Sequence, residues 1–447
     1  MKAKGSRRLE CGDPVNEPRV VEEAMRLINE FMNRVEKHRN ALLNESTTPF
    51  DETIKALTEW LQKIEEKIKE SNDENITNLR KSMLKVGRKM LMLAEQAREK
   101  WLKVYKRELE ELIEELGGRG KVAIMIRGDP FNKDKSFTAH LYTKNLTIEV
   151  SRVARSGGVT ITMNLTGLRG GFHIVTPKLF SDGKLRAMQR GLLLTDGSID
   201  NKGYPEMGTN QLWQSVAWLI AWPGRNSMNI SSVGINDQVS ITWYLKAISH
   251  KGVIRSKAMA AEEVSELGNE EFPLFLLFAI LGDGSVDIGK KRRITLTMGG
   301  GVKHDLWGGS IIERLRSLGF RKKDERYEVT YVVWASKAVE IARKMLDNHS
   351  IKALIEDLST LLDADKLRRL ITLANMRVKP KGRSSIEVAG IKMTVYANRD
   401  GYVELRISRS NYNDAVEILM KLKSAGYEEI ELRRWVVGMQ STWAWMQ

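Results

Sequence analysis

The sequence predicts an α+β protein whose centre is a pseudo-twofold tandem of two αββαββα units. Three observations predict this class: residues 16–116 are almost all helix-forming, residues 121–176 hold short β-branched segments, and a motif near residue 196 recurs near residue 283. We expect a helical region over 1–120, an antiparallel β region over 121–180, repeats over 181–265 and 266–352, and an α/β unit over 353–447.

Composition narrows the class of protein. Of the 447 residues, 42% are apolar and 29% are charged, which is typical of a soluble globular chain. No apolar run reaches the roughly 18 residues that span a membrane, and the first residues lack a secretory signal, so we expect a cytoplasmic protein. A single cysteine excludes an internal disulfide, and the six histidines lack zinc-type spacing.

The net charge of +15 is unevenly distributed. Residues 1–120 hold 24 Lys and Arg against 23 Asp and Glu, which leaves +14 for residues 121–447. A basic excess of this size indicates an anionic partner, most often nucleic acid, although it also serves solubility in heat-adapted proteins. The charge-neutral N-terminal region is therefore expected to pack against the rest of the chain or to mediate self-association.

Helical spacing supports that interpretation of the N-terminal region. Leu57, Leu61, Ile64 and Ile68 form one apolar face after a capped start at Thr48, and a longer helix is expected from about residue 76 to 116. This pattern predicts a helical hairpin or bundle.

The internal repeat begins with two similar segments, MQRGLLLTDGSID (188–200) and FLLFAILGDGSVD (275–287). Each is an apolar helical run that ends in Asp-Gly-Ser. The residues after the two segments also match in order: a Leu-Trp pair (Leu212-Trp213, Leu306-Trp307), then a strand with a Trp three residues before Lys (Trp243 and Lys246, Trp334 and Lys337). A Met-Gly pair also precedes each Leu-Trp pair, at Met207-Gly208 and Met298-Gly299. Four matches in register predict a tandem duplication, with the four tryptophans as core anchors.

These residues resemble the LAGLIDADG homing endonucleases over about residues 183–350. In that family an apolar helix with small residues spaced four apart ends in acidic-Gly, twice per chain. Gly191, Thr195, Ala279 and Gly282 take the small positions here, and Phe278 stands where the family has glycine. The segments GLLLTDGSID and WQSVAWLIAWPG also resemble the PaRep paralogous proteins of heat-loving archaea.

The resemblance implies two adjacent helices that bring Asp196 and Asp283 together. Two carboxylates about 6 Å apart repel by roughly 3 kcal/mol at an effective dielectric of 20, and helix C-termini disfavour carboxylates further. Carboxylate and carbonyl oxygens suit Mg²⁺, so Asp196 and Asp283 are the predicted metal ligands and catalytic residues of a DNA endonuclease.

The predicted partner is double-stranded DNA, with RNA as the alternative. Lys246 and Lys337 are candidates for phosphate contact, although ordinary surface roles fit them better. Asp200 and Asp287 fit turns as well as an outer position of the site. Two other functions stay open: a DNA or RNA binder without cleavage, such as a regulator or a maturase-like protein, and an assembly protein.

One further segment, LSTLLDADKLRRL (358–370), looks like the family motif. Lys366 replaces the terminating glycine and the helical pattern continues past it, so we expect Asp363 and Asp365 to be exposed helix residues.

Overall fold

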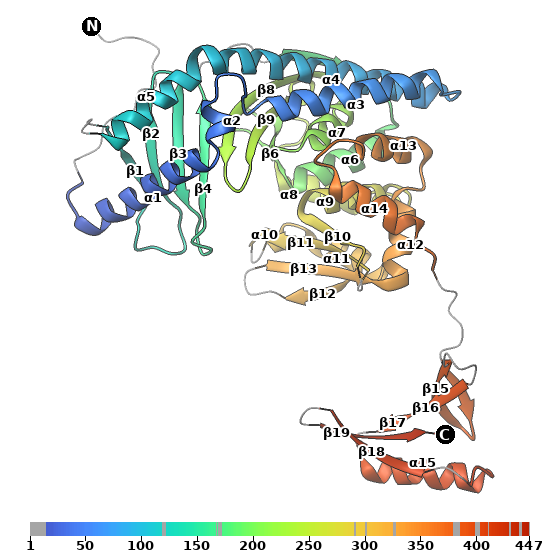
Figure 1. The fold of residues 1–447 in the computed structure, drawn as a ribbon. Helices are drawn as coiled ribbons and strands as arrows, with labels where there is room; N and C mark the ends of the chain where they lie inside the picture. The colour runs from blue at the N-terminus through green and yellow to red at the C-terminus, as the bar shows by residue number, and fades with distance from the viewer. Residues whose placement is uncertain are drawn as a thin grey trace. The chain divides into compact units, whose positions relative to one another are not determined.

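The chain combines helices with antiparallel sheets, which confirms the α+β class (Figure 1). The computed structural model describes residues 15–118, 122–166, 168, 172–289, 292–299, 302–324, 328–378, 385–397, 403–409, 411–428, 431–437 and 440–446. The first compact unit ends at Met376 and the second begins at Arg377. Among the described residues, no helix is both long enough and apolar enough to cross a membrane.

The first unit opens with helices. Their bounds are α1 Pro18–Lys37, α2 Arg39–Leu43, α3 Asp51–Lys69, α4 Glu74–Lys100, the π-helical turn η1 Trp101–Tyr105 and α5 Lys106–Gly117. The start of α3 is fixed by two hydrogen bonds, because the Thr48 amide and hydroxyl both donate to the Asp51 carboxylate, at 2.7 and 3.0 Å. The expected helical hairpin is therefore present as α3 and α4, which pack against each other.

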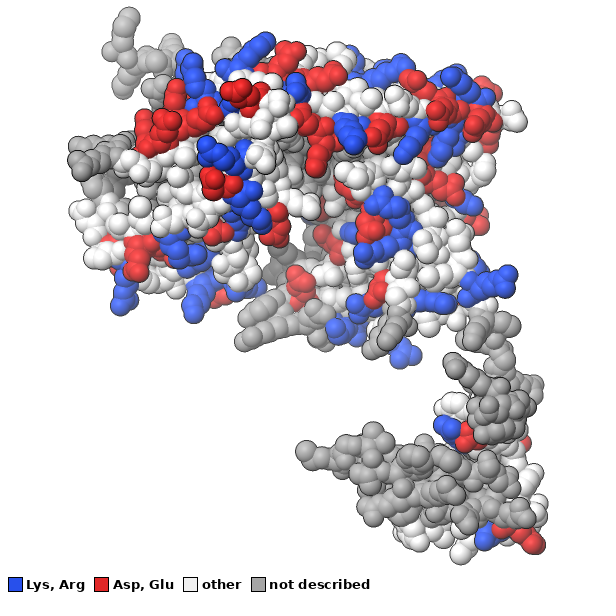
Figure 2. Space-filling model, in the orientation of Figure 1, with Lys and Arg blue, Asp and Glu red and all other residues white. Residues whose placement is uncertain are grey.

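The α3–α4 hairpin is attached to the rest of the first unit through Asp357. This carboxylate is fully buried and pairs with Lys67 at 2.6 Å and with Arg80 at 2.8 Å, while Trp60 Nε1 donates to its backbone carbonyl at 2.9 Å. Removing one member of a buried ion pair costs several kcal/mol. This contact therefore holds the α3–α4 hairpin against α13 of the same chain. Figure 2 shows acidic and basic side chains interspersed along α3 and α4, in agreement with the neutral charge of this region. Self-association through these helices stays a prediction.

A nine-stranded antiparallel sheet comes next along the chain. Its strands pair in the order β1-β2-β3-β4-β8-β9-β7-β6, and β5 also pairs with β8. The bounds are β1 Met125–Arg127, β2 Phe137–Tyr142, β3 Leu146–Arg152, β4 Val159–Leu165, β5 Phe172–Thr176, β6 Gly197–Ile199, β7 Pro205–Thr209, β8 Gly224–Ile235 and β9 Val239–Ala247. The antiparallel strands expected over 121–176 thus join the sheet of the first repeat through β4 and β5, and they do not form a separate layer.

The helices of the first repeat are α6 Asp182–Leu194, α7 Leu212–Ala221, the 3-10 turn η2 Ile248–His250 and α8 Lys257–Ser265. The second repeat contains α9 Glu271–Asp283, β10 Gly284–Asp287, β11 Arg293–Gly299, α10 Val302–Asp305, α11 Gly308–Ser317, β12 Arg321–Asp324, β13 Glu328–Trp334 and α12 Ala335–Met345. Its four strands pair in the order β10-β11-β13-β12.

The two repeats share one topology. Numbered within each repeat, the strands pair in the order first, second, fourth, third: β6-β7-β9-β8 in one and β10-β11-β13-β12 in the other. Each repeat also begins with a long apolar helix and carries a helix between its second and third strands. The duplication inferred from the sequence therefore extends to strand pairing. Figure 1 shows α6 and α9 at the junction of the two sheets.

Two helices complete the first unit, α13 His349–Leu358 and α14 Asp365–Asn375. They pack against α4, α12 and β10. The expected boundary at residue 353 falls inside α13, because the buried Ile351, Leu354 and Leu358 belong to the core of the first unit.

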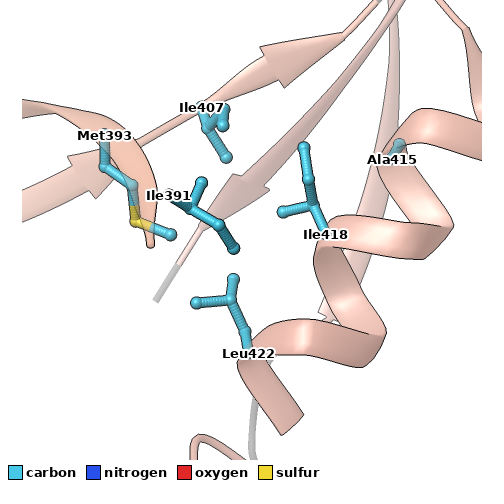
Figure 3. Close-up of a cluster of buried hydrophobic side chains, with 6 residues drawn as sticks. All are labelled: Ile391, Met393, Ile407, Ala415, Ile418 and Leu422. Carbon is cyan, nitrogen blue, oxygen red and sulfur yellow. The ribbon is translucent and has the colours of Figure 1, made fainter. Parts of the chain in front are cut away.

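The second unit is a smaller α/β arrangement. It contains the three-stranded sheet β14-β15-β16 (Ser385–Val388, Ile391–Ala397, Val403–Arg406), the sheet β17-β19-β18 (Ser408–Arg409, Gln440–Met446, Glu431–Val437) and α15 Tyr412–Ser424. Figure 3 shows its core, in which α15 faces the strands through Ala415, Ile418 and Leu422, against Ile391, Met393 and Ile407.

Candidate functional site

The site begins where α6 and α9 cross. A Cβ atom placed on Gly191 would lie 2.7 Å from the carbonyl oxygen of Phe275 and 2.7 Å from the Cβ of Phe278. Real Cβ atoms do not come this close to such neighbours, so only glycine fits at this position. Phe278, which stands where the family pattern has glycine, is accommodated by the missing side chain of Gly191.

A second close contact lies nearer the helix ends. A Cβ atom on Gly282 would lie 2.6 Å from the Cβ of Thr195 and 3.0 Å from Oδ2 of Asp196. The hydroxyl of Thr195 donates to the Gly191 carbonyl at 2.9 Å, which holds the threonine against its own helix. The motif residues Gly191, Thr195, Ala279 and Gly282 thus lie together at this crossing.

The two contacts join equivalent positions of the duplication. Asp196 and Asp283 are 87 residues apart, and the same offset relates Gly191 to Phe278 and Thr195 to Gly282. Each level of the crossing therefore pairs one glycine with one larger residue from the equivalent position. A helix pair related by a pseudo-twofold axis produces contacts of this kind, because only equivalent positions meet on the axis.

Asp196 lies at the end of α6 and is held by a hydrogen-bond chain. Gln214 on α7 donates from Nε2 to Asp196 Oδ2, and Thr209 at the end of β7 donates to the Gln214 carbonyl oxygen. Gln214 and Thr209 are buried, so the orientation of the carboxylate is set from within the repeat.

A hollow of about 340 Å³ opens beside Asp196. It runs over the ends of β7 and α7 and onto the sheet, where its lining is polar or glycine: Thr162, Gly208, Thr209, Asn210, Gln211, Gln214, Gly234, Asn236, Ser240, Thr242 and Gly282. A polar hollow with donors and acceptors on its floor suits a hydrogen-bonding ligand better than an apolar one.

Asp283 lies at the end of α9, next to Asp196. Burial among its neighbours raises the pKa of Asp283, the nearby Asp196 carboxylate raises it further, and the ammonium groups of Lys257 and Lys366 lower it. The structure thus brings the two predicted carboxylates into one electrostatic site together with two lysines, neither of which was expected at the site.

Those lysines bind the ends of the two helices. Lys257, at the start of α8, donates from Nζ to the carbonyls of Leu194 and Thr195 at 3.3 and 3.1 Å. Lys366, in the first turn of α14, donates to the carbonyls of Leu281 and Gly282 at 2.9 and 2.7 Å. The offset of 87 residues relates these two pairs of carbonyls, so both helix ends receive an ammonium group in the same way.

The segment 358–370 was interpreted incorrectly from its pattern. A turn separates α13 from α14, so Asp363 is not a helix residue. It is partly buried, its Oδ2 accepts the Leu212 amide at the start of α7, and burial raises its pKa. Asp365 is an exposed helix residue, as expected. The helical spacing was misleading because Leu361 and Ala364 in the turn are buried as well, although Leu362 is exposed.

Lys246 and Lys337 do not occupy equivalent positions. Lys246 lies within β9 and pairs with Asp200 at 2.7 Å and Glu206 at 3.3 Å, whereas Lys337 lies in α12 and pairs with Glu340 at 3.0 Å. A phosphate contact of either lysine stays a prediction.

Asp200 and Asp287 close the turns after β6 and β10. Asp200 accepts the Lys202 and Tyr204 amides at 2.9 Å each, and Asp287 accepts the Gly289 amide at 2.8 Å. The hydrogen bond from Lys246, together with those amides, lowers the pKa of Asp200 to about 2.

Three of the four repeated tryptophans are core residues. Trp213, Trp243 and Trp307 are buried, but Trp334 is 38% exposed, so its predicted role as an anchor is wrong. Trp243 lies within its strand and Trp334 ends β13, just before Ala335 with φ 53°. The similarity of the two Trp-to-Lys segments is therefore not a structural equivalence.

Each repeat has a more accessible sheet face with polar side chains. In the first repeat, buried Ile241, Trp243 and Leu245 alternate with Ser240, Thr242 and Tyr244 along β9. Across the strands, Ser240 lies opposite Gly234, which lies opposite Thr162, and all three line the hollow beside Asp196.

In the second repeat this face carries cations. Register places Arg321 beside Val332 and Thr295, and Lys323 beside Thr330 and Thr297. Arg293 shares its row with Trp334 and pairs with Asp287 at 3.4 Å. The same face also holds Asp287, opposite Arg293, and Glu328, opposite Gly299, while its central residues Thr295, Thr330 and Val332 are buried. The accessible face is thus mostly neutral in the first repeat, and in the second it carries both signs of charge with a small excess of cations.

The two lysines share one feature that indicates their role once the helix starts are known. Lys257 and Lys366 each lie in the first turn of a helix, where the positive end of the helix dipole disfavours a cation. A lysine at such a position indicates a compensating partner elsewhere. The partner could not be identified from spacing, because Lys257 and Lys366 follow their aspartates at different distances along the chain.

Neither the protein-family models nor the curated proteins include one that matches this chain.

Proposed function

We propose that this chain binds double-stranded DNA through the accessible faces of its two repeat sheets, in a LAGLIDADG-like saddle. The observation that carries the proposal is the pair of sheets with one strand order, joined where α6 and α9 cross at equivalent positions. A pseudo-twofold pair of sheets matches the approximate twofold symmetry of a DNA duplex.

The chemistry of the two faces supports the same ligand. Hydroxyl and amide groups, such as those of Ser240, Thr242 and Asn210, suit base edges in the major groove. Arg293, Arg321 and Lys323 suit phosphates, and the net charge of +14 over residues 121–447 favours a polyanion.

Binding of the full chain to a labelled DNA duplex of random sequence, measured by fluorescence anisotropy over a range of salt concentrations, tests the proposal. We expect saturable binding that weakens steeply as salt rises, since phosphate contacts release counterions. An RNA duplex of the same sequence serves as the comparison, because its deep, narrow major groove excludes a sheet. Equal affinity for both duplexes would indicate recognition of phosphates alone, and absence of binding at physiological salt would overturn the proposal in favour of an assembly role.

Phosphodiester cleavage with Mg²⁺ is the second candidate function. The observation that favours it is the convergence of Asp196 and Asp283 at one site. Incubation of supercoiled plasmid with the full chain and Mg²⁺ tests it. Nicking that disappears in both Asp196→Asn and Asp283→Asn would support cleavage, and nicking that persists in both would exclude these residues as catalytic.

A further inference from the structure

The cations at the Asp196–Asp283 site come from the chain itself. Lys257 donates to the carbonyl of Thr195, the residue before Asp196, and Lys366 donates to the carbonyl of Gly282, the residue before Asp283. The two lysines come from unrelated segments, one before the second repeat and one after it. They nevertheless reach equivalent acceptors at the two helix ends.

The donor atoms do not fit Mg²⁺ as they are arranged. Mg²⁺ requires oxygen ligands in near-octahedral geometry. The carbonyls that adjoin the carboxylates are occupied by ammonium groups, and Oδ2 of Asp196 already accepts the Gln214 amide. Among the described residues, no three His, Cys, Asp or Glu side chains are grouped to hold a metal ion.

Two lysines offset most of the negative charge at the helix junction without a metal. Two carboxylates and two helix C-termini amount to about three negative charges, since each terminus contributes about half a charge. Lys257 and Lys366 offset about two of them, and the nearby carboxylate of Glu328 adds to the negative charge that is left. Both lysines are partly buried, and desolvation lowers the pKa of Lys366 while Asp196 and Asp283 oppose that shift. Desolvation outweighs the two carboxylates, so the pKa of Lys366 lies below its ordinary value.

We propose that Lys257 and Lys366 replace divalent cations at the Asp196–Asp283 junction, so that the junction assembles and duplex DNA binds without Mg²⁺. The part that concerns DNA rests on the proposed function, whereas the part that concerns assembly does not. The lysines act as positioning residues: they hold the two helix ends together and reduce the repulsion between the carboxylates.

Thermal unfolding of the full chain, in EDTA and in MgCl₂ at matched ionic strength, tests the assembly part. We expect the wild-type Tm to be the same in both buffers. Lys257→Met and Lys366→Met should lower Tm in EDTA, and Mg²⁺ should restore part of the loss, because the freed oxygens can then bind it. Lys337→Met is the matched control, since Lys337 pairs only with Glu340 on the exposed side of α12 among the interactions that the structure describes.

Two results would overturn the proposal. One is a Tm that rises with Mg²⁺ in the wild type but not in Asp196→Asn or Asp283→Asn. The other is a pair of lysine variants that unfold at the wild-type Tm in EDTA. If the lysine variants fail to fold, titration of the wild type with Mn²⁺, followed by electron paramagnetic resonance, decides: stoichiometric binding that depends on Asp196 contradicts the proposal, and its absence supports it.

DNA binding is measured separately. The dissociation constant of the wild type for a labelled duplex should agree between EDTA and Mg²⁺ at matched ionic strength. A gain of about tenfold in Mg²⁺, which corresponds to about 1.4 kcal/mol, would overturn the DNA part of the proposal. Failure to bind DNA in either buffer would refute the proposed function. It would not affect the conclusion about the lysines, because that conclusion depends on the thermal unfolding measurements.

Discussion

The first and second repeats share a strand order but differ in what surrounds it. In the first repeat, β8 pairs with β4 and β5, which enlarges four strands to nine, and the accessible face is mostly neutral. The second repeat keeps four strands, and its accessible face carries Arg293, Arg321 and Lys323. The duplication therefore fixed the pairing of strands. The segment before the first repeat enlarged its sheet, and residues within the second repeat determine the charge of that face.

The helices that join the repeats differ in a compensated way. Gly191 faces Phe278, and Gly282 faces Thr195. Each level of the crossing therefore has one glycine, but the glycine comes from α6 at one level and from α9 at the other, and the residue that faces it differs in size. Close packing accounts for this pattern, since two large residues at one level would overlap and two glycines would leave a void.

The largest expected effect comes from filling the crossing at Gly191. Gly191→Ala places a methyl group 2.7 Å from the Phe275 carbonyl, a backbone atom that cannot rotate away. We expect the free energy of unfolding to fall by about 3 kcal/mol, at the upper end of overpacking effects. Chemical denaturation measures it, with Gly117→Ala as the control because no atom lies within 4 Å of the added group. Equal stability of the two variants would refute the close crossing.

A rescue experiment tests whether equivalent positions meet. Gly282→Ala should cost about 2 kcal/mol, because the new methyl group overlaps the Thr195 side chain. Thr195→Gly in the same chain removes the overlapping atoms, so the double variant should recover about 1 kcal/mol relative to the sum of the single changes. Denaturation of the three variants gives this coupling energy, and strict additivity would show that the two positions do not touch.

The two faces should respond differently to substitution. Combining Arg293→Gln, Arg321→Gln and Lys323→Gln in the second repeat should reduce the slope of log K against log salt by about 0.9 for each phosphate that the variant no longer neutralises. Ser240→Ala with Thr242→Val in the first repeat should leave that slope unchanged and alter the sequences enriched from a random duplex pool. If the first-repeat variant changed the salt slope and the second-repeat variant changed the selected sequences instead, the first face would contact phosphates and the second face would contact bases.

The smallest effect concerns the turn after β6. The pKa of Asp200 is about 2, below its ordinary value of 3.8, so its contribution to stability is present above pH 3.8 and is lost as pH falls toward 2. Asp200→Asn should therefore be less stable than the wild type near pH 6, and the difference should vanish near pH 2. Denaturation at several pH values measures it. Asp287→Asn should cost less, because the partner of Asp287, Arg293, is more exposed than Lys246.

Much of the central fold could be predicted from the repeated motif. The Asp-Gly-Ser segments marked two equivalent helix ends, and their offset predicted two equal units in the right order. The small residues predicted the close crossing, because steric limits on Cβ atoms are local and readable from residue type. The join between the strands of 121–176 and the first repeat was missed, since pairing between distant strands leaves no trace in local spacing.

The site was only partly predictable. Asp196 and Asp283 were identified because they belong to the repeat, whereas Lys257 and Lys366 were not, because they lie outside the motif and reach it through the fold. Lys337 was matched to Lys246 from local sequence similarity alone. The structure places one after a strand and the other within one.

The measurement that tests the central claim most directly is the affinity of Arg321→Glu for a labelled duplex, beside that of Arg316→Glu. Both variants change the charge equally, but Arg321 lies on the accessible sheet face and Arg316 on the helix α11. If DNA lies along the repeat sheets, Arg321→Glu weakens binding at least about tenfold and Arg316→Glu only slightly. Equal affinities for the two variants would contradict the account.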